Sequence, residues 1–297
     1  LYYNKDHFDE AGLDYPTNDW TWNEYLMAAQ KLTKRGADGI PTQLGSFSWP
    51  TMWWNSWLIP LLEAGGVPFN DPAWALNGYD DSAFLGKNTK TFPGYSKDAM
   101  KQALQFQHDL LYKYEGCARP GFELPQGAGF LSGNQSMILQ AYNYASNIIA
   151  SEKVVNWGVA YPPAAPTDKG RHATQSYVAG FTMGVQSEHK DAAWAAAKFL
   201  YSVGGRKCNW AQVHFWAWYK DLEEWIFSQA GMDESFQEAL KFADTKDAVF
   251  IPRLGDFNRF FNEAVDPWSD LVFTDEMSVD EAVDNMEREG DAILAGK

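Results

Sequence analysis

The chain opens with Leu1-Tyr2-Tyr3-Asn4-Lys5-Asp6-His7-Phe8-Asp9-Glu10-Ala11-Gly12-Leu13 and continues, a few residues later, with Thr21-Trp22-Asn23-Glu24. The segment 21–24 has the Ser/Thr-x-x-Glu spacing of a capping box, in which hydroxyl and carboxylate satisfy free N–H groups at a helix start. Apolar residues then recur at helical spacing on one stripe: Trp22, Tyr25, Leu26, Ala29 and Leu32. Lys34-Arg35-Gly36 predicts the helix end, because cations and glycine favour a last turn.

Three further helices are predicted by the same signals. They run from Ser96 to Tyr114, from Lys190 to Val203 with an end at Gly204-Gly205, and from the capping box Ser278-Val279-Asp280-Glu281 to about residue 295. The core face of the first carries Ala99, Ala103, Phe106, Leu110 and Tyr114, and that of the last carries Val279, Val283, Met286 and Ile293.

Strands are predicted at 136–141, 155–160 and 177–185, where short apolar runs are rich in β-formers. Their alternation with helices indicates an α/β chain. The Pro- and Gly-containing segment 161–170 lies between the second and third strands. It is the best candidate for a crossover between two domains, and 297 residues suffice for two lobes.

Composition excludes several classes of function. The formal net charge of −15 argues against binding to nucleic acid or to anionic lipid. No stretch approaches the roughly 18 apolar residues of a membrane span. Aromatic residues make up 16% of the chain, and the surplus of Trp and Tyr suits sugars, which have flat apolar faces and polar rims. Three aromatic clusters, 49–57, 141–144 and 214–219, either pack in the core or line a binding cleft.

Motifs of catalysis and of cofactor or metal binding are missing. The sequence has no Gly-x-Ser-x-Gly, His-Glu-x-x-His or Cys-x-x-Cys, and its five histidines share no metal-ligand spacing. Adjacent acidic pairs such as Glu223-Glu224 point apart on regular structure, so no catalytic pair is predicted. Cys117 and Cys208 leave one disulfide and two buried free thiols equally open. We expect no catalytic residue, no metal and no cofactor, as suits a binding protein.

Five segments in register resemble the bacterial extracellular solute-binding proteins of the sugar-binding class. They are residues 1–24, the Phe130-x-x-Gly133-x-x-x-Met137 block, 156–163, 180–194 and 278–295. The resemblance implies a two-lobe, periplasmic-binding-protein-like fold of type II, with ligand held between lobes that close over it. The long first segment of the family has no counterpart here, so we expect the first lobe to be incomplete in this chain.

The resemblance also implies a division of the chain. Residues 1–7 would end the first lobe and 8–162 would form most of the second lobe. Residues 163–176 would be a crossover, 177–222 the returning part of the first lobe, 223–235 a second crossover, and 236–297 the remainder of the second lobe.

Ligand contacts are expected, by the same resemblance, where relatives carry cleft-rim loops. These contacts are Trp53, Trp54, Asn55, Trp57, Tyr142, Asn143, Tyr144, Tyr177, Asn258 and Arg259. At two positions where sugar-binding relatives stack an aromatic ring, this chain has Asn, which argues against a maltodextrin while leaving a sugar. The run 214–219 is expected to cap a lobe.

The implied function is capture of a mono- or oligosaccharide and its delivery to the permease subunits of an ABC importer. Such a protein is periplasmic or extracellular, with a lipid anchor as one form, and we expect a monomer. Two alternatives stay open: a glycoside hydrolase with a carboxylate pair in an aromatic cleft, and a binder of another solute. Arg259 or Arg253 facing the ligand would favour an anionic solute.

Overall fold

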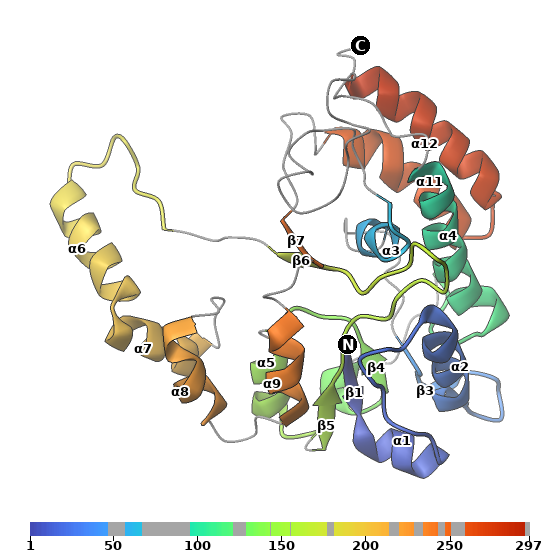
Figure 1. Ribbon diagram of the computed structural model, residues 1–297, viewed down its shortest axis with the longest axis horizontal. Coiled ribbons are helices and arrows are strands. Elements are labelled where there is room, and N and C mark those ends of the chain that lie inside the picture. Colours follow the sequence, from blue (N-terminus) through green and yellow to red (C-terminus); the bar gives the residue numbers. More distant parts are fainter. Residues whose placement is uncertain are drawn as a thin grey trace.

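The computed structural model describes residues 1–46, 57–66, 96–120, 129–142, 144–154, 156–176, 181–213, 220–228, 234–242, 247–250 and 259–294. Its central sheet has the order β4-β1-β5. Strand β1 (Tyr2–Asn4) lies between β4 (Met137–Ile138) and β5 (Trp157–Val159) and runs antiparallel to both. The opening residues of the chain are therefore held by strands from its middle (Figure 1).

Alternation along the sheet divides the apolar residues between two cores. Tyr3 and Met137 belong to the larger core, whereas Tyr2 and Ile138 belong to the smaller one, because successive strand residues point to opposite faces. The smaller core is covered by α5 (Tyr144–Ser151) and α9 (Glu234–Lys241). These two helices lie on one side of β1 and β5 in Figure 1.

The larger core is built mainly from helices on the other side of the sheet. These are α1 (Lys5–Ala11), α2 (Trp22–Leu32), α3 (Leu58–Glu63), α4 (Ser96–His108), the π-helices η2 (Asp109–Lys113) and η6 (Phe260–Val265), α11 (Asp266–Phe273) and α12 (Val279–Leu294). Lys97 on α4 joins α12 through ion pairs of 2.7 Å with Asp284 and Glu287. The 3-10 turn η3 (Phe130–Ser132) adds Phe130 to the smaller core instead. A second 3-10 turn, η4 (Lys220–Leu222), is followed directly by α8 (Glu223–Phe227).

The capping box predicted at α2 is confirmed, and at α12 the half formed by the Ser278 side chain is present. At α2, the Thr21 hydroxyl and the Glu24 carboxylate cap the helix reciprocally, and the whole predicted stripe is buried. At α12, the Ser278 hydroxyl donates to the Glu281 carboxylate, and its oxygen accepts the Glu281 backbone N–H. The predicted faces of α4 and α12 are buried too, with Tyr114 and Val279 partly buried at their edges.

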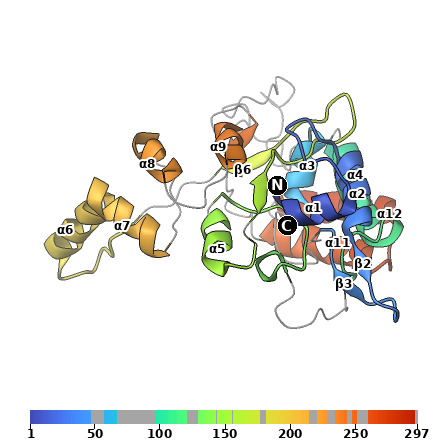
Figure 2. The ribbon, with the colours of Figure 1, turned by 90° about the horizontal axis from the view of Figure 1, so that it is seen from below.

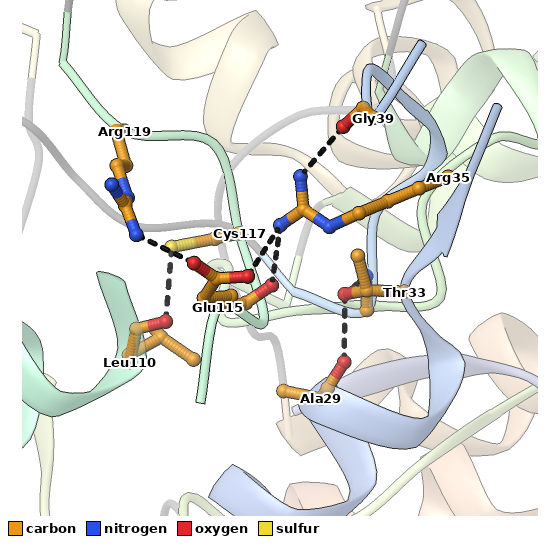
Figure 3. Close-up of polar contacts among 9 residues, drawn as sticks. Ala29, Thr33, Arg35, Gly39, Leu110, Glu115, Cys117 and Arg119 are labelled. Carbon is orange, nitrogen blue, oxygen red and sulfur yellow. Dashed lines mark hydrogen bonds and ion pairs between the residues drawn. The ribbon is translucent and has the colours of Figure 1, made fainter. Parts of the chain in front are cut away.

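The predicted end of the first long helix is wrong. Helix α2 ends at Leu32, and Lys34–Arg35 forms strand β2, paired with β3 (Pro41–Gln43). Thr33 stops the helix, because its backbone is extended while its hydroxyl donates to the Ala29 carbonyl oxygen. The Arg35 guanidinium donates a hydrogen bond to the Gly39 carbonyl oxygen and forms an ion pair with the Glu115 carboxylate (Figure 3).

The third predicted helix also ends earlier than expected. Helix α6 (Lys190–Tyr201) stops before Ser202, and α7 (Val203–Val213) runs through Gly204 and Gly205. Ser202 has an extended backbone, and its hydroxyl accepts a bond from the Gly205 N–H. It thus ends one helix and caps the next.

Of the predicted strands, 136–141 and 155–160 are confirmed as the shorter β4 and β5. The third, 177–185, is wrong for its described part, since 181–185 carries no strand and Val185 is 85% exposed. A strand needs a paired neighbour, and the described residues offer none here. Strand β6 (Thr174–Ser176) lies just before this segment, parallel to β7 (Ala248–Phe250).

Helices α6 and α7 lie away from the two cores in both views (Figures 1 and 2). The α6 residues Trp194 and Phe199 are 59% and 64% exposed. Among the described residues, no helix combines the length and the apolar character needed to cross a membrane.

Neither cysteine forms a disulfide, so of the two alternatives the disulfide is wrong. Cys117 is buried near Leu110, with its Sγ 3.8 Å from that residue's carbonyl oxygen (Figure 3), as a small apolar residue would be. Cys208 is exposed, so the expectation of two buried thiols holds only for Cys117.

Candidate ligand-binding site

Tyr142 and Tyr144 lie at the junction of β4 and α5. The buried Tyr2 hydroxyl donates to the Tyr142 carbonyl oxygen at 2.7 Å and to that of Ala141 at 3.1 Å. The Tyr144 ring meets the Tyr2 ring edge-on, with centroids 5.6 Å apart, and lies 6.2 Å from the Phe130 ring. The central strand therefore fixes this junction by both backbone and ring contacts.

The Tyr144 side chain is partly buried. Burial raises the pKa of its hydroxyl to about 12, so the group is neutral at physiological pH. A neutral phenol can both donate and accept a hydrogen bond, while the ring offers an apolar face. Both properties suit a sugar.

Trp57 and Arg259 are brought to a second region. The Trp57 side chain is 1% exposed and lies just before α3; its ring stacks near that of Phe261 at 6.3 Å and lies 6.5 Å from that of Phe260. The adjacent Arg259 is exposed and forms an ion pair of 3.0 Å with Glu263. The sequence placed residues 57 and 259 in one site, and the structure brings their segments together.

The Trp57 ring belongs to the larger core, and its indole nitrogen is buried with no hydrogen-bond partner among the described residues. Tyr142 and Tyr144 pack against the smaller core. The four described candidates thus form two pairs, which no described contact joins.

Strands β6 and β7 precede, along the sequence, the segments of two further candidates, Tyr177 and Asn258. The two strands are parallel, with Ser176 opposite Phe250, so they end on the same side of this two-stranded sheet. Tyr177 follows β6 directly, and the segment 251–258 follows β7. Six of the predicted site residues lie outside the described residues: Trp53, Trp54, Asn55, Asn143, Tyr177 and Asn258; the cluster 214–219 does so as well.

Sequence reasoning missed the residues that support these candidates. Tyr2 contacts Tyr142 from the start of the chain. Phe260 and Phe261 contact Trp57 from a helix about 200 residues away along the chain. The adjacent pair Phe260-Phe261 was the one available signal. In the parts of the chain that the structure describes, His, Cys, Asp and Glu side chains do not gather in groups of three or more that could hold a metal ion.

The mixed α/β fold is that of the type II periplasmic binding proteins, to which the solved structures of similar fold belong. Residues 1–207 match the family described as bacterial extracellular solute-binding protein. The chain therefore belongs to this family.

Solved structures share the fold at low sequence identity. Maltose-bound MalE3 of T. maritima has a TM-score of 0.73 at 21% identity, covering 98% of this chain and 69% of that one. Lmo0181 of Listeria monocytogenes, in complex with cycloalternan, has a TM-score of 0.71 at 19% identity, covering 99% and 69%. The GacH receptor of Streptomyces glaucescens, solved with acarbose, has a TM-score of 0.67 at 19% identity, covering 99% and 68%.

Proposed function

We propose that this protein captures a sugar or oligosaccharide in an inter-lobe cleft and delivers it to an ABC importer. The observation that carries the proposal is the Tyr142–Tyr144 junction, a neutral, partly buried aromatic surface held by Tyr2. The protein belongs to a family of solute-binding proteins. Relatives of the same fold hold maltose and cycloalternan.

The division into lobes is part of this proposal. Residues 8–162 and 236–297 form one lobe, residues 177–222 belong to the other, and 163–176 and 223–235 cross between them. Residues 1–7, expected at the end of the other lobe, contribute β1 to the sheet of the first-named lobe, where it pairs with β4 and β5. The exposed apolar side chains of α6 are consistent with its membership of a lobe separate from the two cores. This chain covers about 69% of the length of its structural relatives. An apolar helix surface is stable when another layer covers it.

Binding would follow from stacking and hydrogen bonding alone. In this proposal Tyr144, Tyr142 and Asn143 line one wall, and Trp53, Trp54, Asn55, Tyr177, Asn258 and Arg259 line the other regions. Trp57, which is 1% exposed, supports the site from the larger core. Ligand contacts that exist only in the closed form would drive closure of the lobes. The closed, monomeric protein would then dock on the permease at the periplasmic or extracellular side of the membrane, with or without a lipid anchor.

A thermal-shift screen of the unsubstituted protein with saccharides tests the proposal. Maltose, cycloalternan, tagatose and acarbose are the first probes. A ligand present at about 100 times its Kd stabilises the folded state by about 2.7 kcal/mol, which raises the melting temperature by several degrees. No shift with any saccharide would refute sugar capture. Release of a hydrolysis product would favour the glycoside hydrolase instead.

The candidate junction has its own test. Tyr144→Ala should weaken binding of the selected sugar about two- to twelvefold, because one stacked ring contributes about 0.5–1.5 kcal/mol. Tyr15→Ala is the matched control, since that ring is also partly exposed but its hydroxyl bonds to Asp9 near α1. The Kd values are measured by titration calorimetry. Equal values for the two variants would show that the Tyr142–Tyr144 junction is not part of the binding site.

A further inference from the structure

Glu63 is a carboxylic acid in an unusual place. It ends α3, and its side chain is 0% exposed. Its Oε2 accepts a hydrogen bond of 2.8 Å from the Trp22 indole nitrogen. Its Oε1 is equally buried and has no hydrogen-bond partner among the described residues. A buried carboxylate would need stronger compensation than one neutral indole provides.

The residues around this pair hold the proposed crossover, 163–176. The Glu63 carbonyl oxygen accepts the Arg171 backbone N–H at 2.9 Å, and the Leu62 carbonyl oxygen accepts the Arg171 Nε at 3.2 Å. On the other side, the Trp22 N–H donates to the Ala164 carbonyl oxygen at 2.9 Å. The Trp22–Glu63 bond thus connects the two helix ends on which the crossover rests.

The crossover also packs closely on the turn after α3. Gly65 has a φ of +80°, and a Cβ at this position would lie 2.6 Å from the Lys169 carbonyl oxygen. Movement of α3 would therefore be transmitted to the crossover through backbone contacts.

Among the described residues, three charged or titratable groups face Glu63. Just before β1 there is the Leu1 nitrogen, which donates to the Ala160 carbonyl oxygen at 2.9 Å. From α2 there is the Tyr25 phenol, hydrogen-bonded to Ser46, and from the crossover there is Arg171. Burial dominates and raises the pKa of the Glu63 carboxyl to about 8.

We propose that Glu63, as a neutral carboxylic acid, is the positioning residue that seats residues 163–176 on α2 and α3, and that alkaline surroundings loosen this crossover. Opening the crossover would let water reach the carboxyl group, which then loses its proton. Higher pH therefore favours the open state: below the pH at which the native carboxyl group titrates, the equilibrium constant for opening rises by up to about tenfold per pH unit. The inference rests on the proposed function in treating 163–176 as a hinge between lobes.

Amide hydrogen exchange tests the proposal without any ligand. The probe is the Arg171 amide in the full chain, from pH 5 to 8, corrected for the intrinsic exchange rate. The ratio of wild-type protection to that of Glu63→Gln should fall at least tenfold over this range, because the amide side chain cannot ionise. A constant ratio would overturn the proposal. So would exchange of the Arg171 amide at the same rate as the Met286 amide of the α12 core, because both amides would then exchange only through global unfolding.

Asp270→Asn is the matched control. Burial raises the pKa of Asp270 to about 6, but this residue lies on α11, away from the crossover. Its substitution should leave the pH dependence at Arg171 as in the wild type. In case Glu63→Gln does not fold, carbon-13 NMR of the wild-type protein decides: the Glu63 carboxyl should titrate near pH 8, and titration below pH 6 would overturn the proposal.

A binding measurement separates this inference from the proposed function. With maltose as probe, the Kd of the wild type should increase at least threefold from pH 6 to pH 8.5, and that of Glu63→Gln should not. Equal pH profiles would overturn the role of Glu63 in closure. If neither protein binds maltose, the same comparison is made with cycloalternan, tagatose and acarbose. Absence of binding to all four saccharides would count against sugar capture, while the exchange experiment would still decide whether Glu63 seats the crossover.

Discussion

The substitution Glu63→Gln should change how the free energy of unfolding depends on pH. The Glu63 pKa rises from 4.5 to about 8 on folding because the side chain is buried. The folded protein therefore holds a proton that the unfolded chain releases. The stability that this group contributes is complete below pH 4.5 and is lost progressively as the pH rises to about 8.

The magnitude follows from the two pKa values. Each pH unit between them is equivalent to about 1.4 kcal/mol, so the wild type should lose about 5 kcal/mol relative to Glu63→Gln between pH 4.5 and pH 8. Gln keeps an oxygen that can accept the Trp22 indole N–H and has nearly the same volume. The variant should thus retain the packing of α2 on α3.

The comparison between the two proteins is essential. Other groups whose pKa changes on folding also shape the wild-type curve, among them Asp270, whose pKa burial raises to about 6. Urea unfolding of both proteins at pH 5, 6, 7 and 8 isolates the Glu63 contribution. A difference that stays constant across these pH values would refute the reasoning.

Three further substitutions test the packing, by urea unfolding at pH 7. Thr21→Ala removes the α2 cap and should cost about 1 kcal/mol. Met286→Ala empties a fully buried site on α12 and should cost about 2–5 kcal/mol. Gly65→Ala should destabilise by more than about 1 kcal/mol, because of its positive φ and the nearby Lys169 oxygen. Val185→Ala, at an exposed site, is the control and should change stability by less than about 0.5 kcal/mol; equal effects in all four would contradict the assigned packing.

The features that the sequence predicted well are those encoded within a few residues. A capping box such as Thr21-x-x-Glu24 and an apolar stripe at helical spacing act locally, and the structure confirms them. The errors arose where a distant partner or a polar side chain overrode the local signal. Lys34–Arg35 became a strand because β3 was available to pair with it, and the Ser202 side chain separated α6 from α7.

The candidate site was predictable only as segments. Aromatic density and family resemblance selected the Tyr142–Tyr144 and Trp57 segments, but not their surroundings. Trp57 is buried against Phe260 and Phe261, and the Tyr142 backbone is held by a strand from the start of the chain. Such contacts depend on how β1 pairs with β4 and β5, which periodicity does not reveal.

Glu63 shows why the most informative polar residue escaped the sequence. It is one of 39 acidic residues, and its neighbours along the chain form an ordinary apolar turn. Its properties come from Trp22, which is distant along the chain, and from Arg171, which is more distant still. Only the folded chain removes its carboxyl group from water while leaving one oxygen unpaired among the described residues. A buried acid of this kind is costly to fold, so its position between two helix ends and the crossover is better explained by a role in holding that crossover than by stability alone.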